Sequence, residues 1–174
     1  MDSALVELTK KKSNFAPALK KREKDFFLSS YIDVNNIVFL TKKNRNDVIS
    51  ELIENLYKTQ KIKNKNIFFD NIIKREKLFS TGIGMGVAIP HTKNGDFENF
   101  FIAIGIQKKN KINWLSIDKI AVNIVFMIAG PENKQSEYLK ILSKLTSLIK
   151  NESFKNKLLK FEFKEDIFAF FDQN

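Results

Sequence analysis

Two nearly continuous apolar runs in the middle of the chain constrain its fold most strongly. Residues 100–106 contain no polar side chain and residues 122–128 contain a single asparagine, a composition typical of strands that are covered on both faces. Apolar residues recur at helical spacing from Val48 to Leu56 before these runs, and from Tyr138 to Ile149 after them. This order of elements predicts an α/β fold, a sandwich of helices around a mixed, mostly buried β-sheet.

Shorter patterns predict additional elements around this centre. The β-branched and aromatic run at residues 37–40 favours a strand. Asn44 is suited to the N-cap of the following helix, with Asp47 in its first turn. The remaining expected elements are a helix over 66–77 with Ile67, Phe68 and Ile72 facing inward, a short strand at Trp114–Ile117, and two short helices near residues 154–159 and 167–171.

The domain organisation expected from 174 residues is a single core. Residues 1–27 have only scattered apolar positions among lysines, so we interpret them as a basic N-terminal tail. Residues 28–174 form the expected domain, and neither an internal repeat nor a low-complexity linker divides them.

The net charge of +10, from 30 basic and 20 acidic residues, makes nucleic acid and an anionic membrane candidate binding partners. The lysines are spread along the chain among asparagines, isoleucines and phenylalanines, which favours a solvated basic surface, and we do not expect a nucleic-acid partner. No apolar run approaches the roughly 20 residues of a membrane span, and the N-terminus lacks the pattern of a signal peptide. With no cysteine in the chain, these features predict a cytoplasmic protein without a membrane span.

A glycine-rich loop stands before the first long run. Gly82, Gly84 and Gly86 alternate with larger residues and can expose backbone amides to a phosphate oxygen. Their spacing matches neither a dinucleotide-binding fingerprint nor a P-loop, so a purely structural loop remains an alternative. The hydroxyls of Ser80 and Thr81 are candidate phosphate donors, although they are equally suited to capping the loop.

His91 is the only histidine, and it directly follows Pro90. A neutral imidazole is a good nucleophile toward phosphorus near pH 7, although a lone histidine often has only a structural role. We expect a short strand at Val87–Ile89 that Pro90 ends, with His91 left at the mouth of the strand. The guanidinium of Arg75 is the best-placed partner for a phosphoryl group, and its alternative is a solvated arginine at a helix end.

Other reaction classes lack the residues that they need. One histidine and no cysteine leave no pair of metal ligands of these types, so we expect neither a metal nor another cofactor. The carboxylates in this part of the chain show no paired spacing for general acid and base catalysis: Asp70, Glu76, Asp96 and Glu98.

The segments Arg75-Glu76, Ser80–Gly84 and Gly86–His91 resemble the enzyme IIA domains of the fructose and mannitol class of the bacterial sugar phosphotransferase system, including their stand-alone nitrogen-regulatory relatives. The resemblance extends from about Leu28 to the C-terminus. It implies that His91 accepts a phosphoryl group from a histidine-containing phosphocarrier protein, with Arg75 beside it. In transporters of this family the group passes to a IIB domain, whereas the regulatory relatives control other proteins.

Two positions depart from the family pattern. Tyr138 stands where many members have a second histidine, and a tyrosine cannot become cationic near neutral pH. Lys119 replaces a glycine that often follows the aspartate, which we expect to reshape only a hairpin. The chain carries no IIB or IIC sequence, which favours a carrier with a regulatory role. A transport intermediate that serves a separate IIB domain and a regulatory binding module with little phosphotransfer remain the alternatives.

Overall fold

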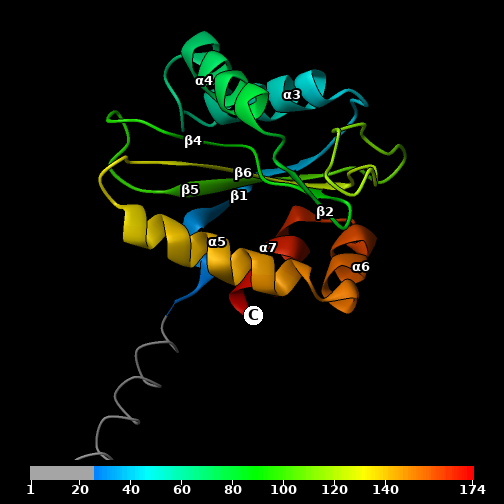
Figure 1. Ribbon diagram of the computed structural model, residues 1–174. Coiled ribbons are helices and arrows are strands. Elements are labelled where there is room, and N and C mark those ends of the chain that lie inside the picture. Colours follow the sequence, from blue (N-terminus) through cyan, green and yellow to red (C-terminus); the bar gives the residue numbers. More distant parts are fainter. Residues whose placement is uncertain (1–25) are drawn as a thin grey trace, which may run out of the picture.

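A mixed six-stranded sheet with helices on both faces forms the computed structural model, which describes residues 26–174 (Figure 1). Helices α3 and α4 cover one face, and α5, α6 and α7 cover the other (Figure 1). After a 3₁₀ turn at Leu28–Tyr31, the elements are β1 (Ile32–Phe39), α3 (Arg45–Lys58), α4 (Lys65–Leu78), β2 (Gly82–Gly84), β3 (Val87–Ala88), β4 (His91–Lys93), β5 (Phe101–Ile106), β6 (Ile124–Gly130), α5 (Gln135–Ile149), α6 (Glu152–Lys160) and α7 (Lys164–Asp172). The α/β sandwich expected from the sequence is confirmed.

Strand β6 is the hub of the sheet. It pairs antiparallel with β5 along its length, and β5 pairs in parallel with β1. On its other edge β6 pairs in parallel with two short strands in succession, β3 at Ile124 and β4 at Ile128. Strand β2 continues the sheet beyond β3 as an antiparallel neighbour.

The core consists of two layers, because alternate side chains of each strand point to opposite faces of the sheet. Every residue of β5 and β6 is buried, as the apolar runs predicted. In β5, Ile102 and Ile104 pack with the cluster under α5, α6 and α7, whereas Phe101 and Ala103 pack with the cluster under α3 and α4.

The helix expectations on the α3 and α4 side are largely confirmed. Asn44 occupies the N-cap position of α3, but its side-chain amide donates to Asp47 at 3.2 Å instead of accepting from the helix amides. In α4, Phe68 and Ile72 are buried four residues apart on one side of the helix. The expectation for Ile67 was wrong: it is 56% exposed, because it lies about 100° around the helix from Phe68.

The short strand expected at Trp114–Ile117 was also wrong. Ile112 forms an isolated bridge with Val122, and the chain then leaves the sheet in turns. Trp114 is fully buried beneath this segment, whereas Ile117 is 65% exposed. The apolar residues of this segment therefore belong to an irregular loop that is anchored by one buried side chain, and not to a strand.

Pro90 acts differently from the expectation. It interrupts the strand, but its carbonyl accepts the Ile128 N–H at 3.0 Å, and pairing with β6 resumes at His91. A proline lacks only the donor of a ladder, so its acceptor keeps the chain against β6. His91 therefore begins β4 within the sheet and does not stand at a free strand end.

Most of the predicted basic tail, residues 1–25, lies outside the described residues. Between residues 26 and 174, none of the helices is both long enough and apolar enough to cross a bilayer.

Candidate functional site

The backbone around β4 fixes the imidazole of His91 in one orientation. Its Nδ1 lies 2.9 Å from the carbonyl oxygen of Ile89. A carbonyl can only accept a hydrogen bond, so Nδ1 carries the proton and Nε2 carries the lone pair. The sequence Ile89-Pro90-His91 thus sets the tautomer through a local contact within three residues.

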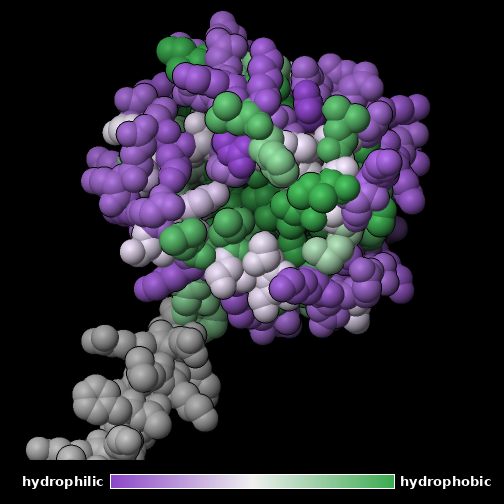
Figure 2. Space-filling view, viewed as in Figure 1, coloured by the Kyte–Doolittle hydropathy of each residue, from purple (hydrophilic) through white to green (hydrophobic). Residues whose placement is uncertain are grey.

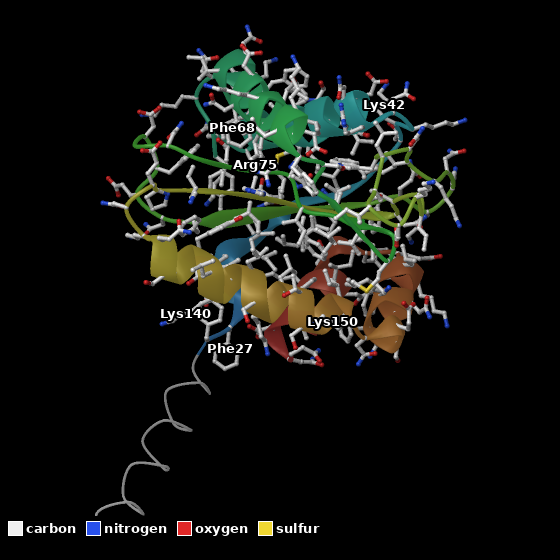
Figure 3. The ribbon with its side chains drawn as sticks, viewed as in Figure 1. Phe27, Lys42, Phe68, Arg75, Lys140 and Lys150 are labelled. Atoms are coloured by element: carbon white, nitrogen blue, oxygen red, sulfur yellow. The ribbon has the colours of Figure 1, made fainter. Side chains whose placement is uncertain are left out.

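Arg75 meets this lone pair from the last turn of α4. Its Nε–H donates to Nε2 of His91 at 3.0 Å, and its Nη1 donates to the carbonyl of Phe79 at 2.9 Å. Figure 3 shows Arg75 on the side of α4 that faces the sheet. The structure therefore brings together the two residues that the sequence ranked first, although they are 16 positions apart.

The electrostatic surroundings of His91 favour its neutral form. Burial lowers the pKa of His91 below its usual 6.5, and the cations of Arg75 and Lys93 lower it further, against an opposing effect of the Ile89 carbonyl and of Glu76. A lowered pKa leaves the imidazole uncharged at pH 7. The lone pair on Nε2 is therefore available for nucleophilic attack once Arg75 releases it.

An open cavity of about 690 Å³ adjoins His91. Its lining carries three basic side chains, Lys74, Arg75 and Lys93, against one carboxylate, Glu132. The other lining residues are Asn71, Leu78, Thr92 and Asn94. Such a lining is suited to an anionic group of several oxygens.

The surface on this side of the molecule also carries apolar side chains. Figure 2 shows them at the centre of the face, between α4 and α5 and ringed by hydrophilic residues. Leu78 and Phe79, at the end of α4 next to Arg75, are 78% and 64% exposed. Exposed apolar groups with a polar rim are typical of a surface that contacts another protein.

Tyr138 lies beside His91, where the family resemblance places the second histidine. It comes from α5, and its ring centroid is 5.7 Å from that of His91. Burial raises the pKa of its hydroxyl above the usual 10.0, against an opposing effect of Arg75. Tyr138 therefore adds a neutral ring to the site and no charge.

The glycine loop lies against a different part of the chain. The N–H of Met85, in the turn between β2 and β3, donates to Asp118 at 2.8 Å, and the Gly82 carbonyl accepts the Ile117 N–H at 3.1 Å. A Cβ on Gly84, whose φ is +93°, would lie 2.7 Å from a carboxylate oxygen of Asp118. Close packing and a left-handed turn thus account for this glycine.

The glycine loop is also separate from the lining of the cavity, which includes none of the residues 80–86. A phosphate-binding role for Gly82, Gly84 and Gly86 stays a prediction. Lys119, near the same loop, has a φ of +61°, a conformation that favours the glycine that the family often has there.

Ser80 and Thr81 have partners within the protein. The Ser80 hydroxyl donates to the Trp114 carbonyl at 3.3 Å, and the Thr81 hydroxyl donates to the carboxylate of Glu76. The phosphate-donor role predicted for these hydroxyls therefore stays a prediction, without a described contact to His91.

Glu76 is a structural residue that the sequence reasoning missed. The residue is 3% exposed, and its carboxylate accepts from the Thr81 N–H and the Trp114 Nε1–H, both at 3.0 Å, while Arg45 of α3 lies 3.8 Å away. The network ties the end of α4 to the loop that follows it, and Arg75 is the preceding residue. Only its position next to Arg75 hinted at this role.

Lys93 was also missed. Side chains two positions apart on a strand share a face, so a strand at 91–93 would have placed Lys93 beside His91. Because we expected the strand to end at Pro90, the sequence did not predict that Lys93 lies beside His91.

Comparison with known proteins agrees with this fold. The family model described as "Phosphoenolpyruvate-dependent sugar phosphotransferase system, EIIA 2" matches residues 30–174. The chain belongs to this family, the type 2 enzyme IIA domains of the phosphotransferase system.

Its relatives include both transport and regulatory proteins. The chain is 33% identical over 135 residues to the fructose-specific EIIABC component of Bacillus subtilis, covering 78% of this chain but 21% of that protein. It is 33% identical over 95 residues to a nitrogen regulatory protein of Bradyrhizobium diazoefficiens, covering 55% of this chain and 61% of the relative. The chain thus spans only part of each of these proteins.

Solved structures give the same picture. The nitrogen regulatory protein IIA-Ntr of Neisseria meningitidis superposes with a TM-score of 0.76 at 25% identity, covering 83% of this chain and 98% of that one. The mannitol IIA of Escherichia coli superposes with a TM-score of 0.66 at 18% identity, covering 80% of this chain and 97% of that one, and supports the fold alone.

Proposed function

We propose that this chain is a phosphoryl carrier that accepts a phosphoryl group on Nε2 of His91 from the phosphohistidine of a phosphocarrier protein. The observation that carries the proposal is the hydrogen bonding of the ring: Nδ1 is held by the Ile89 carbonyl, and the lone pair on Nε2 is directed at Arg75. A nucleophile with one defined tautomer next to a guanidinium is the arrangement that phosphoryl transfer requires.

The transfer proceeds in line. The Nε2 lone pair attacks phosphorus, the Nε2–P bond forms as the N–P bond of the donor breaks, and the electron pair of that bond returns to the donor imidazole. The Nδ1 proton stays in its hydrogen bond to Ile89. In the resting protein Arg75 occupies the lone pair, so its guanidinium shifts from Nε2 to the phosphoryl oxygens as the new bond forms.

A labelling experiment tests this proposal. The full chain is incubated with labelled phosphoenolpyruvate, enzyme I and the phosphocarrier protein, and the acid-labile label is measured. We expect the wild type to take up label only when the phosphocarrier is present, and His91→Ala to take up none. Because His91 is the only histidine in the chain, full labelling of that variant contradicts the assignment.

For the role of the carrier, we propose regulation through its phosphorylation state. The Neisseria regulatory protein, which this chain matches over 98% of that protein's length, supports this role. The similarity to the Bacillus fructose component supports the second candidate, transfer to a separate IIB domain, and the mannitol IIA of Escherichia coli has been solved in complex with a phosphorylated IIB.

Two further assays separate these roles. Loss of label from the phosphorylated chain to a candidate IIB domain supports transport, whereas retention of the label with every IIB tested supports regulation. If the output is partner binding alone, His91→Ala captures partners in a pull-down as well as the wild type does.

A further inference from the structure

Lys93 shares its environment with His91. The two residues are the ends of the three-residue strand β4, so their side chains project from the same face of the strand, while the buried Thr92 between them faces the other way. Both residues line the same cavity, as do Thr92 and Asn94 beside them. The strand therefore presents an ammonium beside the nucleophile.

The position of this ammonium is fixed by two contacts. Nζ of Lys93 lies 4.8 Å above the ring centroid of Tyr138, a cation–π contact, and donates to the side-chain oxygen of Gln135 at 2.6 Å. Both partners come from the first turns of α5. No ion pair of Lys93 is found among residues 26–174, so its charge is uncompensated by a carboxylate there.

We propose that Lys93 is a second cationic ligand of the phosphoryl group on His91, opposite Arg75. The assignment rests on the proposed function and adds a residue to it. Arg75 reaches Nε2 from α4, on one side of the sheet, and Lys93 is held by α5, on the other. The phosphoryl group bonded to Nε2 would thus lie between a guanidinium and an ammonium, both within a cavity that is open to the donor protein.

Tyr138 fits this arrangement because it is neutral. Its aromatic face attracts the ammonium of Lys93, whereas a protonated imidazole at this position would repel it. The proximity of Lys93 to His91 also appears in the lowered pKa of His91, to which Lys93 contributes. Lys93, held against the ring of Tyr138, therefore provides the positive charge that a second histidine would provide.

Among the other charged groups of the cavity, Lys74 is an exposed residue of α4 and Glu132 is an exposed residue of the turn before α5. Neither has a described side-chain contact that directs it at His91. Lys93 is distinguished from them by its place on the strand of His91 and by its two fixed contacts.

The experiment compares four full-length proteins: the wild type, Lys93→Met, Lys93→Arg and the matched control Lys140→Met. Lys140 is an exposed residue of α5 that points away from the sheet (Figure 3). Each protein is labelled through the phosphocarrier as above, and the initial rate and the half-life of the phosphorylated form are measured. Removal of one charged donor predicts a rate about 10-fold lower or more for Lys93→Met, near-normal rates for Lys93→Arg, and no change for Lys140→Met.

A second readout separates phosphoryl binding from a structural role of Lys93. The phosphoryl group of the labelled chain is titrated by ³¹P NMR; loss of a neighbouring cation raises its second pKa in Lys93→Met, whereas loss of packing alone does not move it. If Lys93→Met does not fold, Lys93→Gln replaces it. Unchanged rates and an unchanged titration in a labelled, folded variant overturn the assignment of Lys93, whereas a wild type that takes no label overturns the proposed function itself.

Discussion

The buried carboxylate of Glu76 offers a quantitative test of how the site is supported. Replacing Glu76 with alanine leaves two donors of Thr81 without their acceptor in the buried network, the backbone N–H and the hydroxyl, whereas the Trp114 Nε1–H keeps the Thr81 hydroxyl oxygen at 3.3 Å. Each unpaired buried donor costs roughly 1–3 kcal/mol. The Arg45 side chain is 26% exposed and can be solvated, so its release adds little.

The sum is a loss of about 4 kcal/mol in the free energy of unfolding for Glu76→Ala, a large part of the ~5–15 kcal/mol typical of a domain. Glu76→Gln keeps one acceptor oxygen for the Thr81 N–H, so we expect a smaller loss of about 1–2 kcal/mol. The order of the variants therefore tests the hydrogen bonds separately from the volume of the side chain.

Urea unfolding followed by fluorescence measures these values, because Trp114 is the only tryptophan and contacts Glu76 directly. With a slope of roughly 2 kcal/mol per molar urea, Glu76→Ala shifts the midpoint by about 2 M. Glu162→Ala, at an exposed glutamate, is the control and leaves the midpoint unchanged. A Glu76→Ala midpoint equal to that of the control would refute the reasoning.

Three further predictions concern the site and the core. The pKa of His91 is lowered chiefly by burial, so its NMR titration has a midpoint below 6.5. The unfolded chain binds this proton more readily than the folded chain. The contribution of His91 to the free energy of unfolding is therefore complete above pH 6.5 and is lost as the pH falls toward the pKa of the folded state. A midpoint at or above 6.5 contradicts this. A lysine at position 75 cannot reproduce the two hydrogen bonds of Arg75, to Nε2 of His91 and to the Phe79 carbonyl, so Arg75→Lys lowers the initial rate of labelling by about 10²-fold. A rate near that of the wild type speaks against a role of Arg75 in transfer. Gly130→Ala places a Cβ 2.0 Å from a ring carbon of Phe100, so urea unfolding shows a loss of about 1–3 kcal/mol, whereas Gly95→Ala, with no atom within 4 Å of its Cβ, shows no comparable loss.

The elements that the sequence predicted well are those whose signal is local. The apolar runs at 100–106 and 122–128 became β5 and β6, because a strand buried on both faces needs apolar residues at every position. The predictions that were wrong concern segments in which a tertiary contact overrides the local sequence pattern. Trp114 is buried as an anchor beneath a loop, and a backbone acceptor on Pro90 returns the chain to β6.

The sequence by itself determined the order of the long helices and strands and singled out His91, because hydrophobic periodicity and a lone histidine after a proline are visible in the sequence alone. The tertiary structure decided which groups meet His91. Arg75 lies on α4 and Tyr138 on α5, and both contact His91 only in the folded protein. Lys93 shares a face of β4 with His91 only because pairing with β6 resumes after Pro90. Glu76 supports the site because its buried carboxylate has no access to water and therefore accepts hydrogen bonds from neighbouring groups of the protein. Periodicity records which side of an element is apolar, whereas distances between distant residues exist only after the layers have packed.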